Sequence, residues 1–298
     1  MLVSNQFGIS AWHPAVALGY FAAVLAIGFV VDNPLFQVLG VVGAAALLLV
    51  LDGVRAARLV AGALGLAVLV ALVNPLFNTR GETVLFTWWG GRPYTLEALV
   101  AGVSTALMLA QTLLWFASLS LVLTPDKLMV LFGRWAPSLT LVLTLSLRLV
   151  TSLRRKVARV AQARAGVGLG GGASLGLRVR EGGLVLGSVT AAAFEDGVIT
   201  ADSMKSRGFG LPGRTCYQVV RFRGADGLLA GIVAALAAVV LAAAALGALA
   251  VSFFPEVVFA PVGSLSVCAG ICYWLLICTP LAWQGAGVIR WRSIASSI

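Results

Sequence analysis

The stretch Leu149–Gly166 reads LVTSLRRKVARVAQARAG, and the stretch Phe194–Gly208 reads FEDGVITADSMKSRG. Both belong to a polar insertion, Arg148–Gly208, in a sequence that is otherwise almost continuously apolar. Each stretch has the character of a helix and closes on a triplet made of a small residue, an arginine and another small residue. The fold therefore depends on how two such helices combine with the apolar remainder of the chain.

Composition places the chain among the integral membrane proteins. Hydrophobic residues make up 60% of it and charged residues 11%, whereas soluble proteins carry about 25% charged residues. Its mean hydropathy is +1.01. The four cysteines show no zinc or disulfide spacing and are expected to be buried thiols. No cleaved secretory signal is expected, because Met1–Trp12 lacks a basic segment.

The positive charge is concentrated in one region. From Arg134 to Arg223 the chain has 14 Lys/Arg and 4 Asp/Glu, and this surplus of 10 equals the formal net charge of the whole chain, +10. A cytoplasmic loop has this character under the positive-inside rule. Nucleic-acid binding is not expected, because only two aromatic residues lie between Trp135 and Tyr217, too few for a base-stacking surface.

Six apolar runs are candidate transmembrane spans. Pro75 is expected to end the third run, and Thr95 is expected to cap the fourth. Between Asn74 and Tyr94 we expect a polar, aromatic loop at the membrane interface. The six runs are Ala15–Val31, Leu35–Leu51, Leu59–Val73, Leu96–Leu123, Leu228–Phe253 and Val262–Leu281.

These runs predict an all-α integral membrane protein with about six transmembrane helices and a cytoplasmic domain of long amphipathic helices. Residues 1–123 would form the N-terminal transmembrane helices, 124–226 the cytoplasmic helices with the two arginine triplets, and 227–298 the C-terminal transmembrane helices. With the basic region in the cytoplasm, six spans put both termini inside as well. Of the loop arginines, only Arg80 and Arg92 are then outside.

The first cytoplasmic helix is predicted to open at Pro137 and to be amphipathic. Its apolar residues recur at spacings of four, four and three and share one stripe, whereas its arginines lie on another. The apolar stripe consists of Leu149, Leu153, Val157 and Val160, and the arginines are Arg148, Arg155 and Arg159.

The second cytoplasmic helix is expected after a glycine-dense break at Gly166–Gly172. Because of the sequence Glu181-Gly182-Gly183, we expect it to begin near Leu184 and to run to Arg207. Gly208 could then take the left-handed conformation that closes many helices.

No residue pattern indicates catalysis, a metal site or a cofactor. His13 is the only histidine and is expected to be structural or interfacial. Glu195 and Asp196 point about 100° apart on a helix and cannot clamp one metal ion. Autonomous transporters usually place charges at bilayer depth, whereas here Glu97 lies within a turn of a helix start and Gln111 is the only strongly polar mid-span residue. An autonomous secondary transporter or channel, and a membrane-embedded enzyme, remain as alternatives.

The arginines of the two triplets have two interpretations. A guanidinium at an exposed helix end can hydrogen-bond to carbonyl or carboxylate oxygens of a partner, and small neighbouring residues allow that partner to approach closely. Alternatively, Arg164 and Arg207 only stabilise the C-terminal dipoles of their own helices. Spacing alone does not choose between the two.

Together these residues resemble a known family. Ala163-Arg164-Ala165 and Ser206-Arg207-Gly208 are similar to the two Ala-Arg-Gly signatures of the transmembrane coupling subunit, or T component, of energy-coupling factor (ECF) transporters, the CbiQ/EcfT family. Ala165 stands where that family usually has glycine, and Ser206 where it has alanine. The similarity covers nearly the whole chain and includes His13-Pro14 with Tyr20-Phe21, Asn74–Phe86, Thr95–Leu99, Asp126–Leu128, and Phe132–Pro137 through Leu147-Arg148.

The resemblance implies an importer for a vitamin or a transition metal in the cytoplasmic membrane of a prokaryote. Two cytoplasmic ABC-type ATPase subunits would hydrolyse ATP, a small membrane subunit would capture the substrate, and this chain, itself no enzyme, would couple them within the lipid bilayer. The choice of substrate resides in another polypeptide of such importers. The implied ATPase contacts are Ala163, Arg164, Ala165, Ser206, Arg207 and Gly208, and the stripe Leu149, Leu153, Val157 and Val160 would face the substrate-capture subunit or the second coupling helix.

Overall fold

The computed structural model describes residues 9, 12–78, 81–88, 92–133, 136–168, 175–211 and 222–295. These residues fall into two compact units. One contains the described residues up to Leu128 and from Phe222 onwards, and the other contains those from Met129 to Leu211. Arg80 and the glycines at 170–172, which carry sequence predictions, lie outside the described residues.

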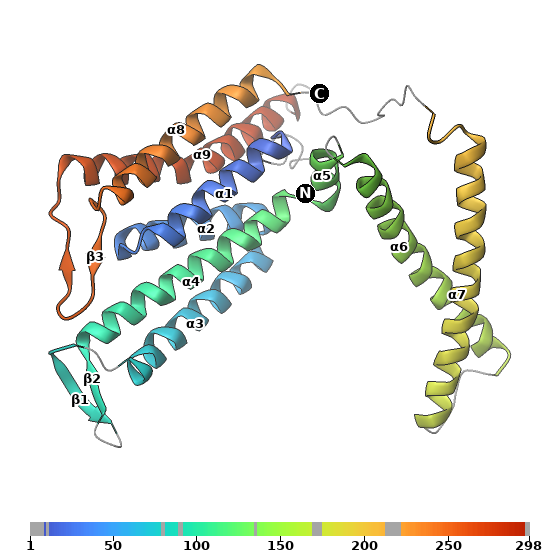
Figure 1. Ribbon diagram of the computed structural model, residues 1–298, viewed down its shortest axis with the longest axis horizontal. Helices are drawn as coiled ribbons and strands as arrows, with labels where there is room; N and C mark the ends of the chain where they lie inside the picture. Colours follow the sequence, from blue (N-terminus) through green and yellow to red (C-terminus); the bar gives the residue numbers. More distant parts are fainter. Residues whose placement is uncertain are drawn as a thin grey trace. The chain divides into compact units, whose positions relative to one another are not determined.

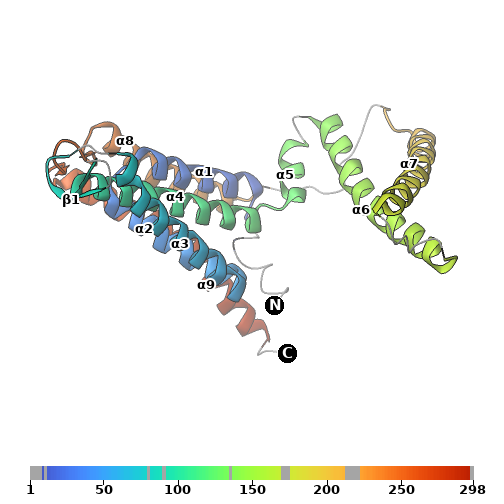
Figure 2. The same ribbon diagram turned by 90° about the horizontal axis from the view of Figure 1, so that it is seen from below.

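The described part of the first unit is a helical bundle (Figures 1 and 2). In this bundle α4 packs against α3, α2 and α1, while α8 packs against α1 and α9, and α9 also contacts α2. The helices are α1 Pro14–Val30, α2 Pro34–Asp52, α3 Val54–Phe77, α4 Leu96–Val122, α8 Gly224–Ala245 and α9 Ser264–Ala295.

Each of the six predicted apolar runs corresponds to one helix of this bundle, which confirms the all-α membrane fold. By length and composition, α2, α3, α4, α8 and α9 can cross a membrane, and α1 is a shorter apolar helix of 17 residues. Among the described residues, a further helix, α7 Leu175–Ser206, is also long and apolar enough to do so. Its predicted cytoplasmic location stays a prediction.

Aromatic rings in edge-to-face contact form part of the bundle core. The ring centroid of Tyr20 lies 5.8 Å from that of Trp12 and 6.0 Å from that of Trp115, and Phe21 lies 6.1 Å from Trp115. All four side chains are at most 3% exposed. Because such pairs contribute about 0.5–1.5 kcal/mol beyond their buried area, the cluster holds the start of α1 firmly against α4.

Glycines on α1 and α2 allow both helices to approach the buried amide of Gln111 on α4. Its Nε2 donates to the carbonyl oxygen of Gly28 at 3.1 Å. Since a carbonyl oxygen can only accept, the amide oxygen Oε1 must point the other way. A Cβ atom added at Gly40 would be 2.1 Å from that Oε1 and 2.8 Å from the hydroxyl oxygen of Tyr273. The mid-span glutamine therefore serves helix packing.

The helix α3 continues through Pro75 to Phe77, so the prediction that Pro75 ends it is wrong. Proline lacks the N–H that would bond to the carbonyl of Ala71, four residues earlier. Gly102 of α4 packs beside this carbonyl, because an added Cβ there would be 3.0 Å from the Ala71 oxygen. Packing against α4 therefore stabilises a helix end that local rules would place before the proline.

The predicted loop between α3 and α4 contains a two-stranded antiparallel hairpin, β1 Val84–Trp88 and β2 Arg92–Thr95. Phe86 and Tyr94 are paired across it, and their rings stack with centroids 4.6 Å apart. Such cross-strand aromatic pairs stabilise hairpins. Thr95 then occupies the predicted N-cap position of α4, although its side chain makes no capping hydrogen bond there.

The predicted fifth run ends too late and the sixth too early. Helix α8 stops at Ala245, where Gly247 takes a φ of +74°, and a short hairpin follows, β3 Val251–Ser252 and β4 Val258–Phe259. Helix α9 continues through Pro280 to Ala295. Hydropathy cannot locate the end of α8, because residues 246–253 are as apolar as those of the helix.

The short helix α5 Pro125–Phe132 contains the junction between the two units. Its Lys127 donates from Nζ to the carbonyl oxygen of Val122 at 2.8 Å and so caps the end of α4. Burial lowers the pKa of Lys127, because loss of water disfavours the charged ammonium.

The second unit is dominated by α6 Pro137–Gly166 and α7, which cross and contact each other (Figure 1). Helix α7 begins at Leu175, so the prediction of a start near Leu184 is wrong. The glycines at 182 and 183 are helical. Each disfavours a helix by only about 1 kcal/mol relative to alanine, which the neighbouring helix-forming residues outweigh.

Candidate docking ends of α6 and α7

Both long helices of the second unit expose most of their surface. Of the described residues, none in α6 is buried, and in α7 Val189 alone is, at 5% exposure. Many large apolar side chains exposed on two helices indicate contact with a partner or with lipid. Exposed large apolar residues include Leu139, Val142, Leu143 and Val150 of α6, and Leu175, Val179, Leu186 and Phe194 of α7.

The first arginine triplet lies inside the last turn of α6. The helix closes at Gly168, whose φ is +77° and whose N–H donates to the carbonyl oxygen of Ala165 at 3.0 Å. The N–H of Val167 donates to the carbonyl oxygen of Arg164 at 3.2 Å. Arg164 is half-buried, and its neighbours Ala163 and Ala165 are exposed.

The second triplet forms the helix end itself. Gly208 has a φ of +77°, as predicted. Its N–H donates to the carbonyl oxygen of Lys205 and the N–H of Phe209 to that of Met204, both at 3.0 Å. These two bonds are the pattern of the Schellman motif, which satisfies the last carbonyls of a helix. Arg207 is exposed on this closed and rigid end.

The two triplets therefore differ in their place on the helix. Arg207 immediately precedes the left-handed glycine, whereas Arg164 lies one turn before Gly168. Ala165 is helical, so no glycine is needed there to turn the chain. The replacement of the usual glycine by Ala165 is thus compatible with the way in which α6 ends.

Neither arginine is engaged by the rest of the described chain. The guanidinium groups of Arg164 and Arg207 have no hydrogen-bond or ion-pair partner among the described residues. A positive charge in the last turn also stabilises its own helix by about 0.3–1 kcal/mol. The two interpretations of these arginines are therefore compatible, because stabilising the helix leaves the five N–H donors of each fork free for a partner.

The predicted apolar stripe of α6 is only partly open. Leu149 is 42% exposed, whereas Leu153, Val157 and Val160 are half-buried. The half-buried part shares a face with Lys156, which contacts α7. This geometry favours α7 as the neighbour of Leu153, Val157 and Val160, and it leaves Leu149 free for another partner.

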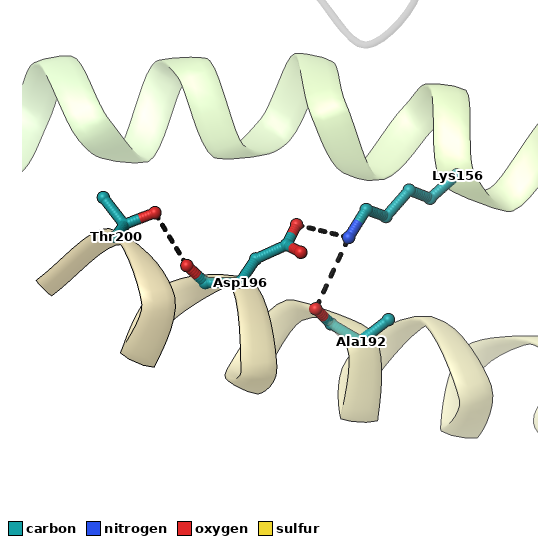
Figure 3. Close-up of polar contacts among 4 residues, drawn as sticks. All are labelled: Lys156, Ala192, Asp196 and Thr200. Atoms are coloured by element: carbon teal, nitrogen blue, oxygen red, sulfur yellow. Dashed lines mark hydrogen bonds and ion pairs between the residues drawn. The ribbon is translucent and has the colours of Figure 1, made fainter. Parts of the chain in front are cut away.

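An ion pair joins the two helices where they meet (Figure 3). The Nζ of Lys156 bonds to the carboxylate of Asp196 and donates to the carbonyl oxygen of Ala192 at 3.4 Å. The pair could not be recognised from the sequence, because 40 residues separate its members. One feature of the sequence does indicate a partner for Lys156. This lysine shares a helix face with Leu153, Val157 and Val160, and on an apolar face an unpaired cation is not expected.

The other polar residues singled out in the sequence have structural contacts. His13 caps α1, because its Nδ1 accepts from the N–H of Ala15 at 3.2 Å. Glu97 is 4% exposed and accepts from both the backbone N–H and the hydroxyl of Thr83, the former at 3.2 Å. In the part of the chain that the structure describes, no three His, Cys, Asp or Glu side chains are grouped so as to hold a metal ion.

Comparison with known proteins places the chain in a family. No curated protein sequence matches it. The profile of the CbiQ family, described as cobalt transport protein, matches residues 7–217, and this range includes both arginine triplets. The match covers well over half of the 298 residues. The chain therefore belongs to the CbiQ family, the family of ECF T components, and is a multi-pass membrane transport component.

Proposed function

We propose that this chain is the coupling subunit of an ECF-type importer for a vitamin or a transition-metal ion. It links two cytoplasmic ABC-type ATPase subunits to a small membrane subunit that captures the substrate. The observation that carries the proposal is the pair of long exposed helices α6 and α7, each with an unengaged arginine at its closed end. The description of the family as cobalt transport protein favours the metal among the two substrate classes.

The arginine ends suit contacts with ATPases for a mechanical reason. A helix that is closed by backbone hydrogen bonds, as α7 is at Gly208, transmits a push without bending at its end. The planar guanidinium fork adds a directional bond to carbonyl or carboxylate oxygens. Because α6 and α7 contact each other, two ATPases bound at Arg164 and Arg207 would act on one connected element.

The exposed apolar surface suits the substrate-capture subunit. The first half of α6, up to Leu149 and Val150, exposes several Leu and Val side chains. Removal of such surface from water contributes about 25 cal/mol per Å² to binding. ATP-driven closure of the ATPases can move this chain only if its contacts differ between the open and closed states.

The proposal places α6, α7 and both termini in the cytoplasm of a prokaryotic cell, with the first unit in the cytoplasmic membrane. Although α7 is apolar enough for a span, it contacts α6, which carries six basic residues and no acidic one. A charge buried at the bilayer centre is costly. A paired helix with these charges is therefore better accommodated in water.

Cysteine labelling tests this topology. In a variant without the four native cysteines, Ser188→Cys on the exposed face of α7 should react with a membrane-impermeant maleimide in inside-out vesicles and not in right-side-out vesicles. A matched control is Phe77→Cys at the end of α3, on the opposite predicted side and 82% exposed. Protection of Ser188→Cys in both vesicle orientations would show that α7 is a membrane span.

Reconstitution tests the function itself. Liposomes that contain this chain, its two ATPases and the capture subunit should accumulate substrate only with ATP inside the compartment that holds the ATPases. Liposomes that contain this chain alone should show no flux of cobalt ions or of the vitamin. Flux through the chain alone would instead support the autonomous secondary transporter or channel.

A further inference from the structure

The apolar contact between α6 and α7 is thin for helices of 30 and 32 residues. Among the described residues of α6 and α7, Val189 of α7 is the one buried side chain. Leu, Val and Ala side chains on such a contact pack comparably after a slide of one turn, because hydrophobic attraction is non-directional. Apolar packing alone therefore does not define how the two helices cross.

The polar contact at the crossing does define it. Lys156 bonds to two acceptors that lie one turn apart on α7, the carboxylate of Asp196 and the carbonyl oxygen of Ala192 (Figure 3). A slide of one turn moves the ammonium by about 5.4 Å, which breaks both bonds. Of the basic residues on α6, Lys156 is the one with an acidic partner among the described residues, so no other ion pair there can replace it.

The ion pair lies some distance from the arginine end of each helix. Counting residues at 1.5 Å each, Arg164 lies about 12 Å beyond Lys156 along α6, and Arg207 lies about 16 Å beyond Asp196 along α7. The helices run in opposite directions through the contact (Figure 1), so the two arginine ends extend to opposite sides of the crossing. A rotation at the crossing is therefore magnified at both ends, and a slide displaces both ends by its full length.

We infer that Lys156 and Asp196 are positioning residues that lock the crossing of α6 and α7 and so set the separation between the arginine ends. We call the pair the fulcrum of the crossing. A displacement of one arginine end is transmitted to the other arginine end only while the ion pair prevents α6 and α7 from sliding past each other. Its role in transport rests on the proposed function, in which one ATPase acts on each end. Its role in the geometry of the chain does not.

Distance measurement on the full chain tests the fulcrum without any partner. In nanodiscs, spin labels at Ala161→Cys and Ser203→Cys, both exposed and outside the triplets, report the separation of the helix ends in a background without native cysteines. The unmodified pair should give one narrow distance distribution. Lys156→Asp and Asp196→Lys should each broaden or shift it, and the double swap K156D/D196K should restore it.

The matched control is Arg155→Asp. This neighbouring residue is exposed and bonds only to its own helix, through the Thr151 carbonyl oxygen, so its variant should keep the narrow distribution. If Lys156→Asp does not fold, Lys156→Gln removes the charge more gently and should broaden the distribution as well. An unchanged distribution in the single variants, or a broad one in the swapped variant, would overturn the inference.

A second measurement connects the fulcrum to transport. With both arginine ends intact, Lys156→Asp should still co-purify with the two ATPases, whereas substrate transported per ATP hydrolysed should fall severalfold and recover in the swapped variant. Normal coupling in Lys156→Asp would overturn the role of the pair. If the unmodified chain binds no ATPase, the proposed function fails, and the distance measurement still decides whether the pair locks the crossing.

Discussion

Arg207→Glu is expected to remove one ATPase subunit from the complex that co-purifies with this chain, and Arg164→Glu to remove the other. Each change replaces a free, five-donor cation with an anion at a helix end. Loss of one member of a buried, hydrogen-bonded charge pair at an interface typically costs about 2–5 kcal/mol, which corresponds to a loss of affinity on the order of 30-fold to several thousandfold, and reversal of the charge adds repulsion to this loss. Affinity purification from cells that express all subunits, with quantified ATPase bands, measures this loss.

The control for both reversals is Arg180→Glu. This arginine is also exposed and lies on α7, but it is near the opposite end of the helix. Its reversal changes the net charge by the same amount and should leave ATPase recovery at the level of the unmodified chain. Unchanged recovery of both ATPases with the double variant Arg164→Glu/Arg207→Glu would contradict the docking role of the triplets.

Gly40→Leu is expected to cause the largest loss of stability in the membrane bundle. Even the first carbon of a side chain at this position would be 2.1 Å from Gln111 Oε1 and 2.8 Å from the Tyr273 hydroxyl oxygen. The leucine must displace Gln111 and with it the hydrogen bond to Gly28. Overpacking a close-packed core costs about 1–3 kcal/mol, and the broken hydrogen bond about 1 kcal/mol more.

The matched control is Gly62→Leu in α3, which is exposed and has open space around an added Cβ. Because leucine favours a helix over glycine by roughly 0.5–1 kcal/mol, this variant should be as stable as the unmodified chain or more stable. Thermal unfolding of the detergent-solubilised proteins, followed by tryptophan fluorescence, compares the two. Equal midpoints for Gly40→Leu and the unmodified chain would show that α2 and α4 do not pack as described.

Much of the architecture could be predicted from the sequence because it follows from local patterns. Apolar runs separated by proline and glycine located six helices of the bundle, and the polar, arginine-rich stretch from Arg148 indicated two further long helices. Gly208 was recognised as a helix-closing residue, since few residues other than glycine tolerate a φ of +77°. The roles of the arginine triplets stay a prediction.

The misplaced boundaries have two physical causes, because neighbouring helix-forming residues outweigh the exposed glycines at 182 and 183, whereas tertiary packing outweighs the proline at 75. The glycines at 182 and 183 and the proline at 75 are helix breakers in local terms, yet α7 and α3 pass through them. At Pro75 the deciding contact comes from Gly102 of α4, which lies beside the freed carbonyl of Ala71. Proline disfavours a helix by about 3 kcal/mol, and packing between two helices can supply a free energy of this size. At Pro75 the contact with α4 therefore decides where α3 ends.

A helical membrane protein with two arginine-ended helices outside the apolar bundle can be predicted without any structure, because hydropathy and helical periodicity are properties of neighbouring residues. The residues that hold those helices together become visible in the packed fold alone. Lys156 meets Asp196 across 40 residues of chain, and Gln111 meets Gly28 and Gly40 on two other helices. Such contacts depend on how whole helices pack, and no local spacing encodes that packing.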